Sequence, residues 1–375
     1  MPVSRRDVLR SIASLPLFAQ AGFAAQRGPA LSRPPLSMTL TGQALMKHPL
    51  CDMPYDGFAD IVAEIQRGDM AFTDLEVAIQ TPRSGAPTRN NSFLHATSPV
   101  VLECLRDMGF DLLALSNNHA WDLGTAGILA TRDAVADAGF AHAGTGANLD
   151  EASAAGTWDG AARVALVSMA SGKIVEGGAA TETRPGVNEV RLSDDDVVEP
   201  DDHHRIMSSI EKAAIESDYV IAYLHNHQWR GDMTVTRTWV REFAKDCAAA
   251  GADVFASHGA PLLHGIEIFK GKPLMYGLGS LVFHSHTEPG YYLPEVWQSA
   301  IVHLDFDADG LKQLTAAPIA LNEIGDNATH HLETRGRPRI ASGDKGAYIL
   351  ERLRQRSAEL GTELTIDGGR LLLGR

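Results

Sequence analysis

Polar side chains that could bind a metal or exchange protons follow a short apolar segment in the middle of the chain. Residues 115–127, LSNNHAWDLGTAG, place Asn118 and His119 directly after the apolar segment 110–115. An amide oxygen and an imidazole nitrogen together suit a divalent metal. The same residue types also occur in capped turns, where asparagine bonds to its own backbone and the histidine is simply polar. This segment alone leaves both interpretations open.

The same arrangement recurs at three other apolar segments, each of which ends in acidic or histidine side chains. Residues 70–73 lead to Asp74 and Glu76, residues 219–224 to His225 and His227, and residues 254–257 to His258. Residues i and i+2 of an extended chain share a face, so both members of a pair can point to one site. Ligands bind at the carboxyl ends of strands in open α/β sheets. The four segments therefore predict one shared site at a sheet edge.

The donor types predict which metal this site would take. Imidazole nitrogens with a carboxylate oxygen suit Zn, Mn or Fe better than Mg or Ca. The alternative is that these polar side chains only hydrogen-bond to one another. The predicted metal ligands are Asp74, Glu76, Asn118, His119, His225, His227 and His258, and the two predicted to take part in catalysis are His119 and His225.

The elements that must position these residues follow an alternating pattern. Apolar segments of strand length alternate with amphipathic helical segments up to about residue 283, and residues 299–321 then alternate like antiparallel strands. This order predicts an α/β sandwich with mixed sheets. We expect the main domain to span residues 36–330 and a helix and hairpin extension to span residues 331–375.

The amino terminus has the layout of an export signal. Arg5 and Arg6 precede a moderately apolar segment that ends in small residues, so residues 1–25 are predicted to be a twin-arginine signal peptide, followed by a Pro-rich linker over residues 26–35. This predicts a periplasmic or extracellular location. No later stretch approaches the length of a membrane span.

Composition narrows the class of protein. A net charge of -14 with 44% hydrophobic residues describes an acidic globular protein, and the absence of a basic patch argues against nucleic acid as a partner. The cysteines Cys51, Cys104 and Cys247 show no metal-binding spacing. We expect Cys104 and Cys247 in the core, Cys51 nearer the surface, and no disulfide framework.

A polar loop over residues 81–92 has two interpretations. It is rich in Pro, Gly, Asn and Arg, so it is either a flexible insertion or a rim that binds an anionic substrate through Arg83 and Arg89.

Several ordered motifs resemble a known family. The motif SNNH-x-x-D-x-G-x-x-G begins at Ser116, Asp74 and Glu76 match the family's N-L-E element, and residues 251–258, 265–273 and 276–283 match its later motifs. The chain thus resembles, over about residues 39–283, the CapA-type capsule-synthesis proteins associated with poly-γ-glutamate. The resemblance implies a two-sheet α-β-β-α sandwich of the calcineurin-like metallophosphatase type with mixed sheets.

Several positions depart from the family pattern, among them Asp74, where the N-L-E element has asparagine, and the segment 225–229, where the family has H-W-G. Gln43 stands where the family has the aspartate of its early G-D element, which resembles the first metal-binding aspartate of metallophosphatases, and Pro261 stands where the family has a second histidine. A neutral amide cannot bridge two metals as a carboxylate does. With Asp74, His227 and His264 nearby, the sequence predicts one divalent metal per site or a rearranged pair.

Three functions remain open from the sequence. The first is an exported CapA-like protein that acts in the synthesis or attachment of a capsule or surface polymer such as poly-γ-glutamate, with a metal-dependent hydrolase or transfer activity as its expected chemistry. The second is a periplasmic metal-dependent phosphoesterase. The third is a non-catalytic member that binds an acidic polymer or partner proteins. The expected partners are an anionic polymer or phosphoester substrate and a membrane-bound polymer-synthesis complex.

Overall fold

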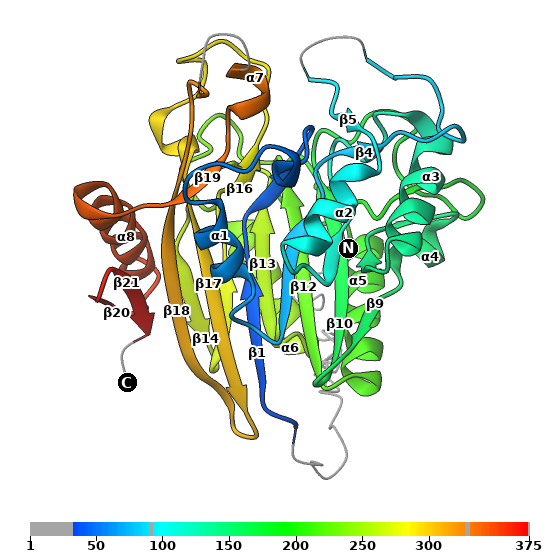
Figure 1. Ribbon diagram of the computed structural model, residues 1–375. Helices are drawn as coiled ribbons and strands as arrows, with labels where there is room; N and C mark the ends of the chain where they lie inside the picture. Colours follow the sequence, from blue (N-terminus) through cyan, green and yellow to red (C-terminus); the bar gives the residue numbers. More distant parts are fainter. Residues whose placement is uncertain (1–32, 90–92, 327–330, 374–375) are drawn as a thin grey trace, which may run out of the picture.

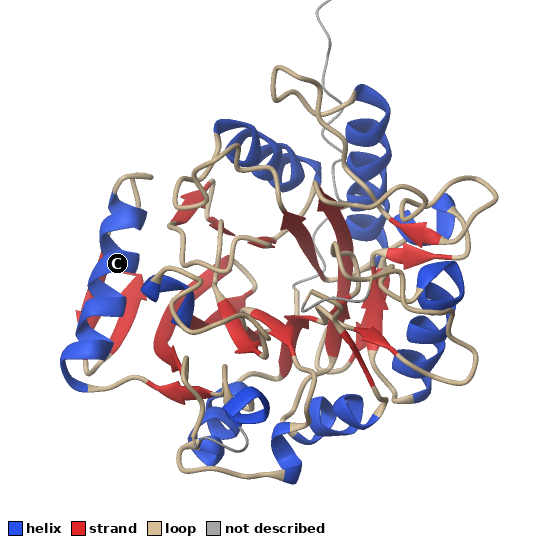
Figure 2. Ribbon diagram, turned by 90° about the horizontal axis from the view of Figure 1, so that it is seen from above, coloured by secondary structure: helices blue, strands red, loops and turns tan. Residues whose placement is uncertain are grey.

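The computed structural model describes residues 33–89, 93–326 and 331–373 (Figure 1). These residues form a nine-stranded and a six-stranded β-sheet, short paired strands, and helices that surround the strands when the molecule is viewed from above (Figure 2). The predicted signal peptide and most of the predicted linker lie outside the described residues. None of the helices in the described ranges is long and apolar enough to cross a membrane.

The larger sheet joins parallel strands to antiparallel ones. Its parallel strands are β1 (Leu36–Leu40), β3 (Met70–Asp74), β6 (Leu112–Ala114) and β7 (Ala141–Ala143). Its antiparallel strands are β17 (Gln298–Asp307), β18 (Gly310–Leu321), β19 (Pro338–Ile340), β20 (Leu364–Asp367) and β21 (Arg370–Leu373). The order is β20-β21-β18-β17-β1-β3-β6-β7, and β19 pairs with β18.

The smaller sheet has the same mixed character. Its parallel strands are β10 (Arg163–Ser171), β12 (Tyr219–Asn226), β13 (Val254–His258) and β15 (Lys272–Met275). The antiparallel strands β9 (Gly156–Asp159) and β14 (Ile266–Phe269) lie at its two edges. The prediction of an α/β fold with mixed sheets is therefore confirmed.

Side chains on both faces of the strands are buried, which explains why the strands are almost continuously apolar. Met38 and Phe72 of the larger sheet belong to the same buried cluster as Leu166 and Ile221 of the smaller sheet. Alternate residues such as Ala71 face the other way. The helices that cover these outer faces are α1 (Phe58–Ile65) and α2 (Val100–Asp107) on the larger sheet, and α5 (Pro200–Glu216) and α6 (Thr238–Ala250) on the smaller sheet.

The remaining elements are short or lie toward the edges. The helices are α3 (Gly124–Asp137), α4 (Leu149–Ser153), α7 (His331–Thr334), α8 (Gly343–Ala358), η1 (Leu50–Asp52) and η2 (Pro294–Trp297). The short strand pairs are β2 (Gln43–Leu45) with β16 (Ser280–Phe283), β4 (Ala78–Ile79) with β5 (Ala96–Thr97), and β8 (Thr145–Gly146) with β11 (Gly186–Val187). The carboxyl-terminal hairpin extends the larger sheet, because β21 pairs with β18.

The expectation that no disulfide forms was wrong. Cys51 and Cys104 are joined by a disulfide that links η1 to α2, with their Cα atoms 5.6 Å apart. Cys104 is buried as expected, but its side chain faces η1, which packs on α2. Such a contact between residues separated by 53 positions depends on tertiary packing that spacing alone does not reveal. Cys247 is buried and free.

Candidate functional site

The strand ends singled out in the sequence meet between the two sheets. Asp74 ends β3 in the larger sheet, and its Oδ2 lies 3.0 Å from Nδ1 of His225, which β12 carries in the smaller sheet. Asn118 follows β6, and its Oδ1 lies 2.9 Å from Nε2 of His225. His258, the last residue of β13, lies opposite His225 in the register of the smaller sheet. The two sheets therefore present their polar strand ends to one another.

Within this group, the side chains that converge as a metal site are Glu76, His225 and His227. One ligand atom from each of these residues lies within 4.8 Å of the other two. Glu76 Oε2 and both ring nitrogens of His227 are buried and have no hydrogen-bond partner among the described residues. Unpartnered buried donors and acceptors are costly, and a bound cation would satisfy them.

The hydrogen bonds of His225 support the same assignment. Its Nδ1 lies 3.0 Å from the Asp74 carboxylate, which can only accept a hydrogen bond. Its Nε2 is thereby directed at the Asn118 carbonyl oxygen, at 2.9 Å, and at Glu76 Oε1, at 3.7 Å. The nitrogen and these oxygens are all atoms that can ligate one cation. Imidazole nitrogens and carboxylate oxygens are the donors of Zn, Mn and Fe sites, so these residues fit a divalent metal.

A second layer holds the converging side chains in place. Asn117 Nδ2 donates to Asp74 Oδ1 at 3.1 Å and to the Leu75 carbonyl oxygen at 2.8 Å. The Tyr223 hydroxyl lies between Nδ1 of His225, at 3.3 Å, and Nδ1 of His258, at 3.2 Å. The structure therefore uses the Asp74 carboxylate, predicted as a ligand, to hold His225 and Asn117, whereas Nε2 of His258, also predicted as a ligand, is buried without a hydrogen-bond partner among the described residues. The Asp74 carboxylate thereby orients His225.

His119 forms a separate hydrogen-bonded unit at the cavity wall. Its Nδ1 lies 2.9 Å from Asp122 Oδ2, and Asp122 also accepts a hydrogen bond from the His95 backbone and pairs with Arg89 at 2.9 Å. The His95 ring stacks on the His119 ring with their centroids 3.9 Å apart. The Asp122 carboxylate therefore fixes Nδ1 as the donor and leaves Nε2 of His119 to act as an acid or base.

Burial controls the protonation of these groups. It raises the pKa of Glu76 well above the ordinary value, and the neighbouring Asp74 and Asp122 carboxylates raise it further. Burial lowers the pKa of His227 well below its ordinary value, and it lowers that of His119, where Asp122 opposes the effect. The His227 and His119 imidazoles are thus neutral at neutral pH, the form in which an imidazole binds a metal, and a cation could replace the proton of Glu76.

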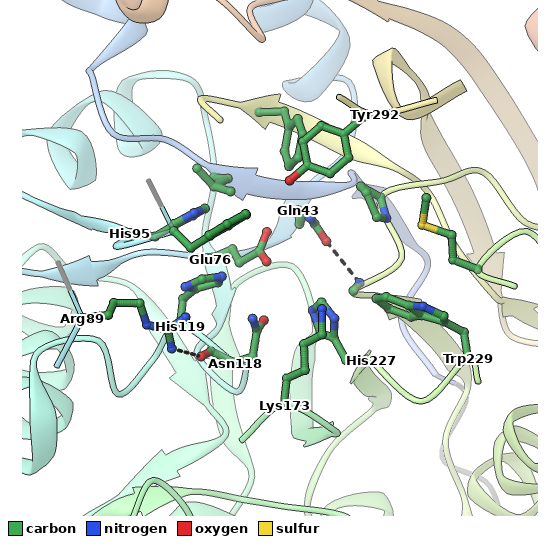
Figure 3. A pocket seen from close by; sticks show the side chains of 16 residues that line it. Gln43, Glu76, Arg89, His95, Asn118, His119, Lys173, His227, Trp229 and Tyr292 are labelled. Carbon is green, nitrogen blue, oxygen red and sulfur yellow. Dashed lines mark hydrogen bonds between the residues drawn. The ribbon is translucent and has the colours of Figure 1, made fainter. Parts of the chain in front are cut away.

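These groups open into a cavity of about 320 Å³ with mixed walls (Figure 3). In that view Arg89 and His119 lie on one side, and Lys173, His227 and Trp229 lie on the other. The lining side chains combine acidic, amide, cationic, imidazole and apolar types: Gln43, Leu45, Glu76, Arg89, Phe93, His95, Asn118, His119, Lys173, His227, Trp229, Met233, Pro261, Phe283 and Tyr292. A charged ligand with apolar or planar parts suits such a cavity.

Gln43 has a defined role in the cavity. Its Oε1 accepts a hydrogen bond from the Gly259 backbone at 3.1 Å, and its side chain also bonds to the Glu76 carboxyl. Because the amide is neutral, it holds Glu76 in place without adding a charged metal ligand. Pro261 also lines the cavity and offers no donor atom. These two departures from the family pattern thus lie at the site itself.

The structure also separates residues that the sequence grouped together. Arg89 lines the cavity, whereas Arg83 forms an exposed ion pair with Asp133. His264 bonds to the Met233 carbonyl oxygen and does not line this cavity. Sequence reasoning missed His95 and Lys173, both of which line it. A usable signal for Lys173 was the Gly-Lys pair that directly follows the strand segment 163–171.

Known proteins are similar in sequence to much of this chain. Residues 37–285 match the family described as bacterial capsule synthesis protein PGA_cap. The chain is 25% identical over 425 residues to the uncharacterized protein y4sH of Sinorhizobium fredii, across 88% of this chain and 91% of that protein. It is 27% identical over 231 residues to the PGA biosynthesis protein CapA of Bacillus subtilis, across 60% of this chain and 55% of that protein.

Two further comparisons complete this picture. The capsule biosynthesis protein CapA of Bacillus anthracis is 23% identical over 298 residues, across 77% of this chain and 68% of that protein. The solved structure of the NAD nucleotidase NadN of Haemophilus influenzae aligns with a TM-score of 0.37 and 8% identity, across 86% of this chain and 56% of that one. The family match covers more than half of the chain, so the chain belongs to the bacterial capsule synthesis protein PGA_cap family.

Proposed function

We propose that this protein is a metal-dependent enzyme that hydrolyses or transfers an anionic surface polymer during capsule production. The relatives named for poly-γ-glutamate and capsule biosynthesis support the polymer class. The observation that carries the proposal is the convergence of Glu76, His225 and His227 in a cavity whose wall also contains Arg89 and Lys173. A metal beside cationic side chains suits an anionic substrate.

The chain's own residues have distinct roles in this proposal. Glu76, His225 and His227 would hold the metal, which would supply Lewis-acid chemistry at the site. His119 Nε2 accepts a proton from the attacking water as its oxygen bonds to the substrate carbonyl carbon. The same nitrogen returns the proton to the amide nitrogen as the carbon–nitrogen bond breaks. Asp122 keeps the other ring nitrogen of His119 protonated throughout.

The proposal also names the metal, which follows from the donor atoms, and the fold type. Imidazole and carboxylate donors favour Zn, Mn or Fe. Gln43 and Pro261 add no charged ligand, so we infer one ion per chain. The assignment of the two sheets and their outer helices to the metallophosphatase type of α-β-β-α sandwich belongs to the same proposal.

A phosphoester substrate is the second candidate. The pair of His119 and Asp122 beside the converging ligands suits protonation of a departing alkoxide as well as a departing amine. A third candidate, a non-catalytic polymer-binding protein, is favoured by Gln43, since this residue provides no charged metal ligand.

Hydrolysis assays separate these candidates. The metal-loaded protein should shorten poly-γ-glutamate, and the His225→Ala variant should lose metal and activity while remaining folded. His204→Ala, which changes an exposed histidine on α5, is the matched control and should behave like wild type. Cleavage of phosphoesters alone would favour the second candidate. Failure to cleave either substrate, with metal bound, would contradict an enzymatic role.

Export and assembly are further parts of the proposal. The twin-arginine signal over residues 1–25 would take the folded protein to the periplasm or beyond, where it would act with a membrane-bound polymer-synthesis complex. The disulfide between Cys51 and Cys104 supports an oxidising compartment. Lysine in place of Arg5 and Arg6 should retain the protein in the cytoplasm, because the receptor reads the arginine pair. Unchanged export of that variant would rule out this route.

A further inference from the structure

Lys173 lies in the cavity wall but has no role in the proposed metal binding or proton transfers. β10 ends at Ser171, and the His227 backbone N–H donates to the Ser171 carbonyl oxygen at 2.7 Å. The chain then turns through Gly172, so Lys173 emerges next to His227 and lines the cavity. In Figure 3 its side chain extends toward His227.

The backbone at this turn adopts the left-handed conformation. Gly172 has φ of 79°, and a Cβ atom there would lie 3.0 Å from the His227 carbonyl carbon, so only glycine fits without adjustment. Lys173 has φ of 55°, which is unfavourable for a residue with a side chain. Residues held in such conformations cluster at ligand-binding sites. The fold therefore keeps a lysine where glycine or asparagine would be less strained.

The charge of Lys173 faces the cavity. Its Nζ lies 5.2 Å from the centroid of the Trp229 ring, on the same side of the cavity as His227. Among the described residues, no carboxylate forms an ion pair with this ammonium, whereas the Arg89 guanidinium is bound by Asp122. Of the two cationic side chains that line the cavity, Lys173 is therefore the one that can pair with an anionic ligand without breaking an ion pair among the described residues.

We propose that Lys173 binds a free carboxylate of the polymer next to the bond that is cleaved, and so selects an anionic chain. This inference rests on the proposed function. Each γ-linked glutamyl unit uses its side-chain carboxyl in the amide bond and keeps its α-carboxylate free, only a few bonds from that amide. A carboxylate at Lys173 would therefore hold the amide near Glu76, His225 and His227. Trp229 forms the neighbouring part of the wall.

Substitutions at Lys173 test the charge without relying on activity. Asparagine tolerates the left-handed conformation and removes the charge, whereas arginine keeps the charge. We expect Lys173→Asn to weaken the affinity of the metal-loaded protein for poly-γ-glutamate by roughly 10- to 100-fold, the effect of losing a hydrogen bond to a charged group. Lys173→Arg should restore most of the affinity. Lys345→Asn, an exposed lysine on α8, should leave it unchanged.

Three measurements define the outcome. Calorimetric titration gives the affinity, metal analysis shows that the variants still bind the ion, and steady-state kinetics should place the loss for Lys173→Asn mainly in KM. A polymer whose carboxylates have been converted to amides should bind wild type and Lys173→Asn equally. Equal affinity of these two proteins for the charged polymer would overturn the inference.

Failure of this inference can be told apart from failure of the proposed function. Binding that depends on Lys173, without any cleavage of the polymer, would retain the inference and remove the enzymatic proposal. Cleavage that does not depend on Lys173 would retain the enzymatic proposal and remove the inference about Lys173. Inorganic phosphate should compete with the polymer only weakly. If phosphate binds in a Lys173-dependent manner and the polymer does not, the carboxylate assignment is wrong and a phosphoester is the ligand.

Discussion

The Asp74 carboxylate and the His225 imidazole join the two sheets across the site. Asp74 is the last residue of β3 in the larger sheet, His225 lies near the end of β12 in the smaller sheet, and 3.0 Å separates Asp74 Oδ2 from His225 Nδ1. Both side chains are fully buried. The contact determines which nitrogen of His225 points toward Glu76, so the geometry of the metal site depends on how the sheets pack.

Removing the Asp74 charge should weaken metal binding. In Asp74→Asn the amide keeps the shape of the side chain but no longer stabilises the ring orientation and basicity of His225. Loss of such a partner typically lowers metal affinity by about 10- to 100-fold. Competition with a chromophoric chelator measures the change. Asp60→Asn, on the exposed face of α1, is the control. Equal affinities of all three proteins would show that Asp74 does not support the ligand.

Gln43 lies beside Glu76, so an acidic substitution at this position should change the number of ions that the site binds. Gln43→Asp would place a carboxylate beside Glu76, and carboxylates can bridge two metals. We expect the variant to bind two ions per chain under conditions in which wild type binds one. Gln43→Asn, which stays neutral, should still bind one. Elemental analysis after gel filtration gives the ratio, and an unchanged ratio in the aspartate variant would count against the single-ion explanation.

The sequence predicted that the site residues share one edge of a sheet, because strands that alternate with helices usually run parallel. β3, β12 and β13 are parallel to their neighbours within each sheet, so polar residues after each strand lie at the carboxyl edge of that sheet. The sequence could not decide which carboxylate, that of Asp74 or that of Glu76, converges with His225 and His227. That choice depends on side-chain direction beyond the end of β3, where the regular alternation no longer applies.

Other parts of the site depended on tertiary contacts between distant segments. His95 is brought onto His119 by the backbone hydrogen bond from His95 to Asp122, although no local pattern marks it. Lys173 lies in a turn whose left-handed backbone is unusual for lysine. The alternation of strands and helices, by contrast, predicted the mixed α/β fold because burial on both strand faces leaves a continuous apolar pattern.

The disulfide predicts a measurable contribution to stability. Replacing Cys51 and Cys104 by serine removes a cross-link between residues separated by 53 positions. Restriction of the unfolded chain by a loop of this length is worth about 4 kcal/mol. We expect the free energy of unfolding in urea to fall by up to this amount, with Cys247→Ser as a comparison for a buried free cysteine. No loss of stability in the double variant would indicate that the cross-link does not form.

His264 lies away from the metal site, and its protonation should make the stability of the fold depend on pH. Burial lowers its pKa from 6.5 to about 4, and its Nε2 bonds to the Met233 carbonyl oxygen. Between these pH values the unfolded chain binds the proton and the folded chain does not. The free energy of unfolding therefore falls as the pH falls through this window, by roughly 3 kcal/mol for this group.

The test for His264 compares urea unfolding at pH 7 and pH 4.5. His264→Gln, which keeps a side-chain donor, should lose less stability than wild type between these values. His204→Gln, on the exposed side of α5, should lose as much as wild type. An equal loss in the His264 variant would mean that this residue is not buried as a neutral imidazole.

The central claim is that Glu76, His225 and His227 hold one transition metal. Crystals of protein purified with its native metal, measured on both sides of the Zn, Fe and Mn absorption edges, test this most directly. We predict one anomalous difference peak per chain, located between Glu76, His225 Nε2 and His227 and contacted by Asn118 Oδ1. Ordered side chains with no peak at this position in crystals grown with added metal would contradict the claim, and so would a peak elsewhere in the chain.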